Sequence, residues 1–412
     1  MLLRQYGLLF ETKRLPFWLT FLTLAALPCS ITAMNWGLGI AAVSLLVLRF
    51  SGRDRFYVPP LLAPIGALFL WTLASILASG HAAQGWEGIR KFYLFSALFL
   101  TAGTVRSRAD ARWLVWGLTA TTTLSAAWSL VQFYRKYEAA QAVHADFRLS
   151  YTAGERITGF MSHWMTLSGE EMIVLLLIAG LALFGGAQRL RVPLAVCGAA
   201  IAISLAAGYT RSMWMGTALG AGFLLWRRYR RWLLVLPVTA ALVLLVNPAG
   251  IGSRLQSAWR PAGDVDSNRF RVICRRTAVA MVRAHPWFGV GPGQVRPQFL
   301  SYIPADIERP LPPGAYIHMH NTYLQFASER GLPALAALLW LLGKIVWDLM
   351  RMLRRDPDNW VLRSAMAATF AVLAAGWYEH NLGNGEVLPL FLAVVGCAYA
   401  CANARCDIKL TP

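Results

Sequence analysis

The stretch that decides the fold is WMTLSGEEMIVLLLIAGLALFG, residues 164–185. Its only charged side chains are Glu170 and Glu171, and the residues from 172 onward are apolar or glycine. A helix that crosses the hydrocarbon core of a bilayer needs about 20 mostly apolar residues. This run meets that requirement and therefore predicts a membrane-spanning helix.

Eleven other apolar runs support the same reading. They lie near residues 15–33, 36–50, 60–79, 88–104, 113–133, 192–208, 212–226, 232–247, 331–350, 361–378 and 385–402. Of the 412 residues, 57% are hydrophobic and 14% are charged, whereas soluble domains carry about 25% charged residues. The six cysteines are too few for a disulfide framework. We therefore predict an all-α, polytopic integral membrane protein with about 12 transmembrane helices.

The positions of Lys and Arg predict the orientation of these helices. Basic residues cluster in alternate connections, for example at 227–231 and 351–355, and such clusters mark cytoplasmic loops. Both termini are then expected in the cytoplasm. The chain divides into residues 1–247, with nine spans and a short outer loop near 134–160, a large outer loop at 248–330, and residues 331–412, with three spans and a cytoplasmic tail.

The large outer loop is rich in arginine and contains no lysine. Its arginines are Arg254, Arg260, Arg269, Arg271, Arg275, Arg276, Arg283, Arg296, Arg309 and Arg330. Guanidinium is a planar fork suited to bidentate contacts with phosphate or carboxylate. Residues 268–284 have the spacing of an amphipathic helix, with Arg271, Arg275 and Arg276 on its polar face. A phosphate site and a basic helix lying on lipid headgroups are both compatible with this pattern.

The stretch Gly289-Val-Gly-Pro-Gly293 follows that helix. It lacks the lysine of a P-loop and no predicted strand precedes it, so an ordinary glycine-rich turn is favoured over a phosphate cradle.

Two histidines, His318 and His320, precede the tenth span on the outer side. Histidine is the usual general base near neutral pH, although a histidine that caps a helix or snorkels is the common alternative. His163, at the start of the sixth span, is a lesser candidate.

Arg211 stands between two apolar runs on the same predicted face. An arginine at membrane depth costs about 2.5–3.5 kcal/mol unless it is paired or snorkels. An anionic lipid headgroup, or Glu170 and Glu171, are its possible partners.

Other chemical classes find less support. Asp264-Val-Asp266 resembles a metal-binding D-x-D motif, but a short acidic motif in a loop is common by chance. No zinc-protease or nucleophile-elbow motif is present, and we expect no metal, no cofactor and no nucleic-acid partner. A 12-span secondary transporter is the alternative of another class, with only Gly52-Arg-Asp-Arg55 as a short match to a transporter loop signature.

Taken together, the outer motifs resemble the O-antigen ligase family, which includes O-antigen polymerases and some bacterial protein oligosaccharyltransferases. His320-Asn321, nine residues and Gly331 resemble one family pattern, with Ala334 outside its usual last position. The run from Arg271 through Ala278, Met281 and Pro286 to Gly291 resembles a second pattern, in which Arg275 replaces a tryptophan. The segments 210–216 and 156–169 resemble two others.

This resemblance implies a membrane glycosyltransferase of the GT-C-like, inverting and metal-independent type, with its site on the periplasmic side of the bacterial inner membrane. Its donor would be a glycan on undecaprenyl diphosphate, and its acceptor a sugar hydroxyl of the lipid A–core. By position, Arg211 and Arg271 would contact the donor diphosphate, and His320 would activate or position the acceptor hydroxyl. Secondary candidates are Arg156, Arg275, Arg276, Arg309 and His318. A polymerase or a protein O-oligosaccharyltransferase is the alternative within the family.

Overall fold

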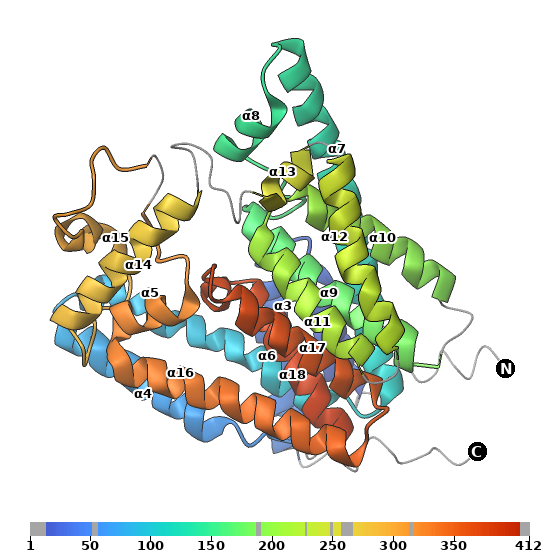
Figure 1. Ribbon diagram of the computed structural model, residues 1–412. Coiled ribbons are helices and arrows are strands. Elements are labelled where there is room, and N and C mark those ends of the chain that lie inside the picture. Colours follow the sequence, from blue (N-terminus) through green and yellow to red (C-terminus); the bar gives the residue numbers. More distant parts are fainter. Residues whose placement is uncertain are drawn as a thin grey trace.

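The computed structural model describes residues 14–51, 57–186, 191–226, 229–247, 250–256, 267–312 and 316–403. Every regular element in these ranges is a helix. Figure 1 shows a bundle from which the end of α7 projects, with α14 and α15 to one side of it.

The first half of the chain forms α2 (Leu15–Ala26), α3 (Ile31–Phe50), α4 (Leu62–Ser79), α5 (Ala82–Arg90), η3 (Lys91–Phe95), α6 (Ser96–Thr104), α7 (Arg108–Ala142), α8 (Phe147–Ala153), α9 (Trp164–Phe184) and α10 (Arg191–Ala207). The second half forms α11 (Arg211–Trp226), η5 (Arg230–Leu234), α12 (Val235–Val246), α13 (Ile251–Gln256), α14 (Ser267–Ala284), α15 (Val295–Gln298), η7 (Phe299–Tyr302), α16 (Thr322–Arg355), α17 (Trp360–Ala375), η8 (Asn381–Gly383) and α18 (Val387–Ala402).

Five described helices are long and apolar enough to cross a membrane, namely α3, α4, α7, α9 and α16. Shorter apolar helices occupy 15–26, 191–207, 237–246, 360–375 and 387–402. Each of the twelve predicted runs overlaps a helix. The run at 88–104 is divided, because α5 ends at Arg90 and a 3-10 turn separates it from α6. The count of twelve spans therefore stays a prediction.

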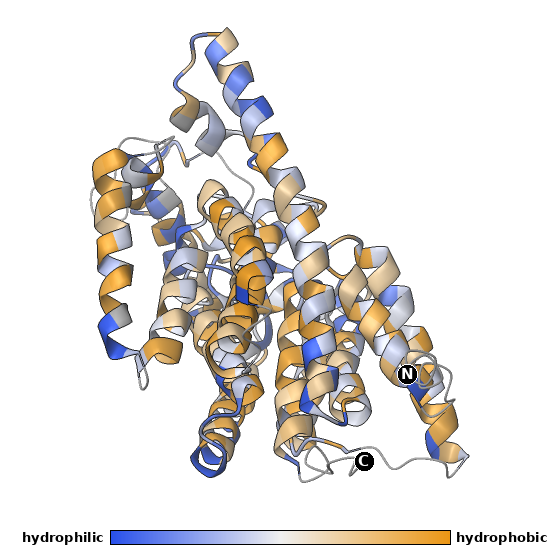
Figure 2. Cartoon of the chain, turned by 90° about the vertical axis from the view of Figure 1, so that its right-hand side faces the viewer, coloured by the Kyte–Doolittle hydropathy of each residue, from blue (hydrophilic) through white to orange (hydrophobic). Residues whose placement is uncertain are grey.

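The centre of the bundle is formed by α9, α17 and α18. All residues of α18 except its last are buried, and α17 is buried over most of its length. Both helices are predominantly apolar on all sides, with Arg363 of α17 as the exception, which is typical of helices enclosed by others. Figure 2 shows this hydrophobic character along the bundle helices and a more polar character at the projecting end of α7.

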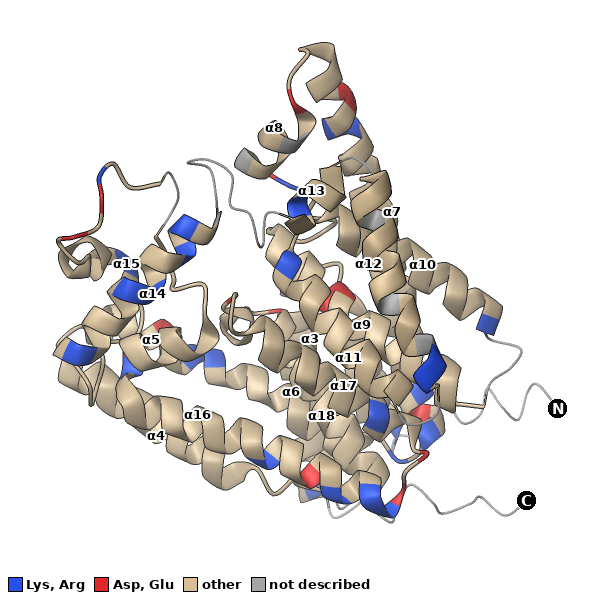
Figure 3. Ribbon diagram, viewed as in Figure 1, with Lys and Arg blue, Asp and Glu red and all other residues tan. Residues whose placement is uncertain are grey.

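The predicted basic ends are visible in the bundle. Lys and Arg gather at the end near the two termini and again around α14 (Figure 3). At the first of these ends, Arg14 lies 2.5 Å from Asp110, and Arg108 pairs with Asp356. The Arg53–Arg55 cluster and residues 404–412 lie outside the described residues.

The helix predicted at residues 268–284 is α14, which begins at Ser267. Ile273 and Met281 on its apolar face are buried against Phe299 and Met319. The apolar face of this amphipathic helix is therefore buried by packing within the protein.

The helix that contains the tenth predicted span, α16, starts at Thr322 and is kinked at Gly331, the residue at which that span was predicted to begin. Gly331 has φ 82°, a backbone conformation that favours glycine. A Cβ there would lie 1.9 Å from the carbonyl oxygen of Trp287. The glycine-rich segment 289–293 packs against this kink, since the amide of Val290 donates to Ser328 O and that of Gly291 to Glu329 O. Close backbone packing accounts for these glycines, as the turn interpretation predicted.

Candidate functional site

One cavity of about 290 Å³ collects most of the residues predicted for the site. It is lined by Arg156 and His163 from the segment before α9, Arg211 at the start of α11, Arg254 of α13, Phe270 and Arg271 of α14, His318 and His320 before α16, and Glu379 after α17. Arg211, Arg271 and His320 therefore line the same cavity, although they lie far apart in the sequence.

Glu379 is the centre of the charge network in this cavity. Its Oε1 accepts from Arg271 Nη2 at 2.5 Å, and its Oε2 lies 3.2 Å from His320 Nδ1. The side chain of Glu379 is only 2% exposed. Burial by itself would raise the pKa of this carboxyl, but the charge of Arg271 and the hydrogen bond from His320 outweigh it and lower the pKa to about 2.

The ionised Glu379 fixes the proton on His320. A carboxylate only accepts hydrogen bonds, so the Nδ1 of His320 is the donor in this contact. In the neutral imidazole, Nε2 is then left as the acceptor. The ring of His320 lies edge-on to Phe270, with ring centroids 5.2 Å apart. The arrangement presents an oriented proton acceptor in the cavity.

His318 has the opposite tautomer. Its Nδ1 accepts from the backbone N–H of His320 at 3.2 Å, so in the neutral ring the proton is on Nε2. Burial, with a smaller effect of His320, lowers the pKa of His318 to about 4, which keeps the ring neutral at pH 7. The two rings, with centroids 4.2 Å apart, thus offer one donor and one acceptor.

The backbone around His320 is held in place by its neighbours. His320 has a positive φ of 45°. Next to it, Asn321 caps α16 by accepting from the Leu324 amide and donates its side-chain amide to Trp377 O at 2.9 Å. Thr322 donates to Glu379 O at 3.0 Å. These contacts join the start of α16 to the turn that carries Glu379.

The arginines converge from separate elements. Arg211 donates to Asn268 Oδ1 at 2.8 Å. Arg156 and Arg254 both donate to Tyr209 O, at 3.3 Å and 3.5 Å. Burial lowers the pKa of Arg156 to about 10, so it remains charged at pH 7.

The cavity is strongly electropositive. Among the described residues, four guanidinium groups line it, against the one carboxylate of Glu379. The N-terminus of α11 also borders the cavity through Thr210 and Arg211, and a helix N-terminus carries partial positive charge. An anion with more than one negative charge fits this environment.

Three secondary candidates lie away from the cavity lining. Arg275 is placed over the ring of Tyr378, 5.6 Å from its centroid, Arg276 pairs with Asp306 at 2.6 Å, and Arg309 is exposed. The remaining two, Arg156 and His318, line the cavity.

Glu170 and Glu171 are fully buried in α9 and do not line the cavity. Their carboxylate oxygens have no hydrogen-bond partner in the described part of the chain, so the pairing with Arg211, one of the possibilities left open by the sequence, is not observed. Asp264 and Asp266 lie outside the described residues.

Sequence reasoning missed Glu379. It stands in the short polar turn between the two last apolar runs, on the same predicted face as the large loop. Ionisable residues within membrane spans are rare and often functional, and the position of Glu379 directly after the predicted span 361–378 is the signal that could have found it. Its partners could not be read from the sequence, because they lie on α14 and before α16.

These features define an integral membrane protein that holds a positively charged cavity with an oriented histidine at one end of its helices. Residues 199–339 match the family model described as O-antigen ligase, which confirms the resemblance predicted from the motifs and indicates a membrane enzyme of the O-antigen ligase or polymerase type. The matched segment contains Arg211, Arg271 and His320, whereas Glu379 lies outside it. No curated protein matches the chain significantly.

Proposed function

We propose that this protein is an O-antigen ligase, which transfers a glycan from undecaprenyl diphosphate to a sugar hydroxyl of the lipid A–core on the periplasmic side of the bacterial inner membrane. The observation that carries the proposal is the convergence of Arg211, Arg271 and His320 on one cavity. The family match supports the same class of reaction.

The chemistry requires a leaving group to be stabilised. The acceptor oxygen attacks the anomeric carbon, the bond from that carbon to the phosphate oxygen breaks, and the electron pair leaves with the diphosphate. Inversion follows from attack on the face opposite the leaving group. Positioned guanidinium groups stabilise the charge that develops on the phosphate oxygens. Arg211 and Arg271 are assigned to this task, with Arg156 and Arg254 adding to the positive field.

The acceptor hydroxyl must lose its proton during the attack. His320 Nε2 is assigned as the acceptor of this proton, and Glu379 stabilises the imidazolium that forms. A positioned general base contributes roughly 10²–10⁴-fold to a rate. His318 has a donor in the same cavity, and we assign it to hold the hydroxyl oxygen while His320 takes the proton.

The same arrangement of charged side chains would serve any acceptor with a hydroxyl group. A polymerase would use a hydroxyl of a second lipid-linked glycan, and a protein O-oligosaccharyltransferase would use a serine or threonine. The distinction therefore rests on what reaches the cavity rather than on its charged groups.

The test is transfer in vitro with purified protein in nanodiscs. An undecaprenyl diphosphate glycan is supplied with lipid A–core, with a second lipid-linked glycan or with an acceptor protein in separate reactions. We expect glycosylated lipid A–core. Uptake of a solute into proteoliposomes, with no transfer to any of the three acceptors, would contradict the proposal.

A further inference from the structure

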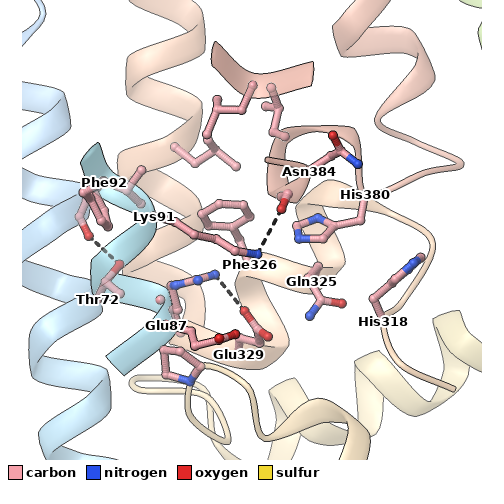
Figure 4. A pocket seen from close by; sticks show the side chains of 18 of the residues that line it. Thr72, Glu87, Lys91, Phe92, His318, Gln325, Phe326, Glu329, His380 and Asn384 are labelled. Carbon is pink, nitrogen blue, oxygen red and sulfur yellow. Dashed lines mark hydrogen bonds and ion pairs between the residues drawn. The ribbon is translucent and has the colours of Figure 1, made fainter. Parts of the chain in front are cut away.

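The candidate cavity is bordered by two differently built regions. At Ile317 and His318 it adjoins a larger cavity of about 430 Å³, which Figure 4 shows with His318 and His380 on one side. At Arg156 and Arg211 the neighbouring region is instead closely packed and aromatic. The proposed reaction uses the charge of both arginines, so their spacing matters for the binding of an anion.

A buried cluster of rings lies behind these arginines. Phe147 and Tyr151 of α8 are stacked, with ring centroids 5.0 Å apart, and Tyr151 meets Tyr209 edge-on at 5.1 Å. Tyr151 is 3% exposed and Tyr209 is fully buried. Ile157 and Ala207 belong to the same apolar cluster. Because close packing restricts each ring to one position, the oxygen of Tyr151 is held at a defined place.

The Tyr151 hydroxyl makes two hydrogen bonds inside this cluster. It accepts from the backbone N–H of Ile157 at 3.2 Å and donates to Ala207 O at 2.8 Å. Burial raises the pKa of this hydroxyl, so it keeps its proton at neutral pH and donates and accepts at once. One oxygen atom thus joins the segment before α9 to the end of α10.

Both of the joined segments carry a cavity arginine. Arg156 directly precedes the residue whose N–H is bonded, and Arg211 begins α11 shortly after Ala207. In the turn between α10 and α11, Tyr209 has a φ of 53°, a left-handed conformation that is uncommon for a large side chain and persists where the surroundings fix it. Its carbonyl oxygen accepts from Arg156 Nη1 at 3.3 Å. The Tyr151 hydroxyl therefore sets the spacing of Arg156 and Arg211 through the backbone.

Arg156 has a hydrogen-bond donor available for a ligand. Its Nε is buried and has no hydrogen-bond partner in the described part of the chain, and its guanidinium carbon lies 5.3 Å from the centre of the Trp164 ring. A buried donor without a partner costs free energy, and the oxygens of a bound anion would accept from it. The placement of Arg156 relative to Arg211 then decides whether one anion contacts both groups.

We propose that Tyr151 is a positioning residue for anion binding, whose hydroxyl holds Arg156 and Arg211 at the spacing at which both guanidinium groups contact one diphosphate. A displacement of about 1 Å is enough to weaken such a contact strongly. That the anion is the diphosphate of a glycan donor rests on the proposed function. The spacing itself is tested with inorganic diphosphate, which carries the same charged group.

The experiment measures the Kd of inorganic diphosphate for the purified chain in nanodiscs. Wild type, Tyr151→Phe, Arg156→Ala and the double variant form a double-mutant cycle, in which diphosphate bound elsewhere on the protein cancels. Tyr151→Phe removes one oxygen and keeps the buried ring. Tyr399→Phe is the matched control, because Tyr399 is also fully buried and its hydroxyl donates to Asp348 at 2.7 Å, outside the cavity lining.

We expect Tyr151→Phe and Arg156→Ala each to weaken binding by about tenfold, and Tyr399→Phe to leave it unchanged. The double variant should bind within about twofold of Arg156→Ala alone, because a spacing between two groups no longer matters when one of them is absent. A loss of about a hundredfold in the double variant would show independent effects and overturn the proposal. Equal binding by wild type and Tyr151→Phe, or no binding by wild type, would overturn it as well.

Transfer kinetics separate this inference from the proposed function. Tyr151→Phe is expected to raise the KM for the lipid-linked donor by about tenfold and to leave the KM for the acceptor unchanged, a difference that a general loss of structure would not produce. The expected binding cycle without any transfer by wild type would contradict the function and leave the positioning role standing. Transfer by wild type with an unchanged donor KM in Tyr151→Phe would overturn the positioning role and leave the function standing.

Discussion

His320 Nδ1 lies 3.2 Å from Glu379 Oε2, and these residues are 59 positions apart in the sequence. The same carboxylate holds Arg271 through its other oxygen. One buried acid thus links the histidine proposed for acceptor activation to an arginine proposed for leaving-group binding.

His320→Ala is expected to lower the transfer rate by roughly 10²–10⁴-fold, because the proton acceptor is removed. Transfer from a lipid-linked glycan is measured with purified protein. His285→Ala is the control, since His285 is exposed and hydrogen-bonded to Tyr302, away from the cavity. Full activity of the His320 variant would refute its role.

Glu379→Gln is expected to lower kcat by about 10²-fold or more, because an amide does not impose the acceptor tautomer on His320 or stabilise its cation. Steady-state kinetics on the correctly folded variant measure this change in kcat. Glu379→Asp keeps the charge, and partial rescue by it separates orientation of the histidine from packing. If the Gln and Asp variants were equally impaired in kcat, the charge would have no special role.

The stability of the protein is expected to fall in acid because of Glu379. Its pKa is about 2 in the folded protein, against an ordinary value of 4.5. The ionised form therefore stabilises the fold above pH 4.5, and this contribution is lost as the pH falls from about 4.5 to about 2. Apparent Tm in detergent, measured between pH 7 and pH 3, should drop more for wild type than for Glu379→Gln. Parallel curves would contradict the assignment.

Arg211→Lys is expected to lose at least 90% of the activity, because an ammonium group cannot replace the bidentate fork of guanidinium. The matched control is Arg276→Lys, whose arginine pairs with Asp306 outside the cavity. Transfer is assayed for both variants at saturating acceptor. Wild-type rates for Arg211→Lys would count against a diphosphate contact at this position.

Chelation is expected to leave transfer intact, since four guanidinium groups supply positive charge at the proposed diphosphate site. Activity is measured with and without EDTA. Strong inhibition that magnesium reverses would revive Asp264 and Asp266 as metal ligands.

Much of the fold followed from local sequence patterns. Each apolar run predicted a helix, and the amphipathic spacing at 268–284 predicted α14, because hydropathy and helical period act between neighbours along the chain. The break at Arg90 and the kink at Gly331 were not predicted. The kink depends on the backbone of Trp287, which lies directly against Gly331 and leaves no room for a Cβ there.

The candidate site was likewise predicted only in part. Arg211, Arg271 and His320 were identified by motif, whereas Arg275, Arg276 and Arg309 were equally plausible from composition and lie outside the cavity. The role of Glu379 and the tautomers of His318 and His320 became apparent only from hydrogen bonds in the folded structure.

The sequence by itself determined that this chain belongs in a membrane and that the segment 248–330 is rich in arginine and free of lysine, since both depend on residue type and local order. The tertiary structure alone decided which arginines meet, which acid joins Arg271 to His320, and that a second cavity adjoins them. The physical reason is that hydrogen bonds and ion pairs act over a few ångströms in space, and helix packing sets those distances independently of separation along the chain.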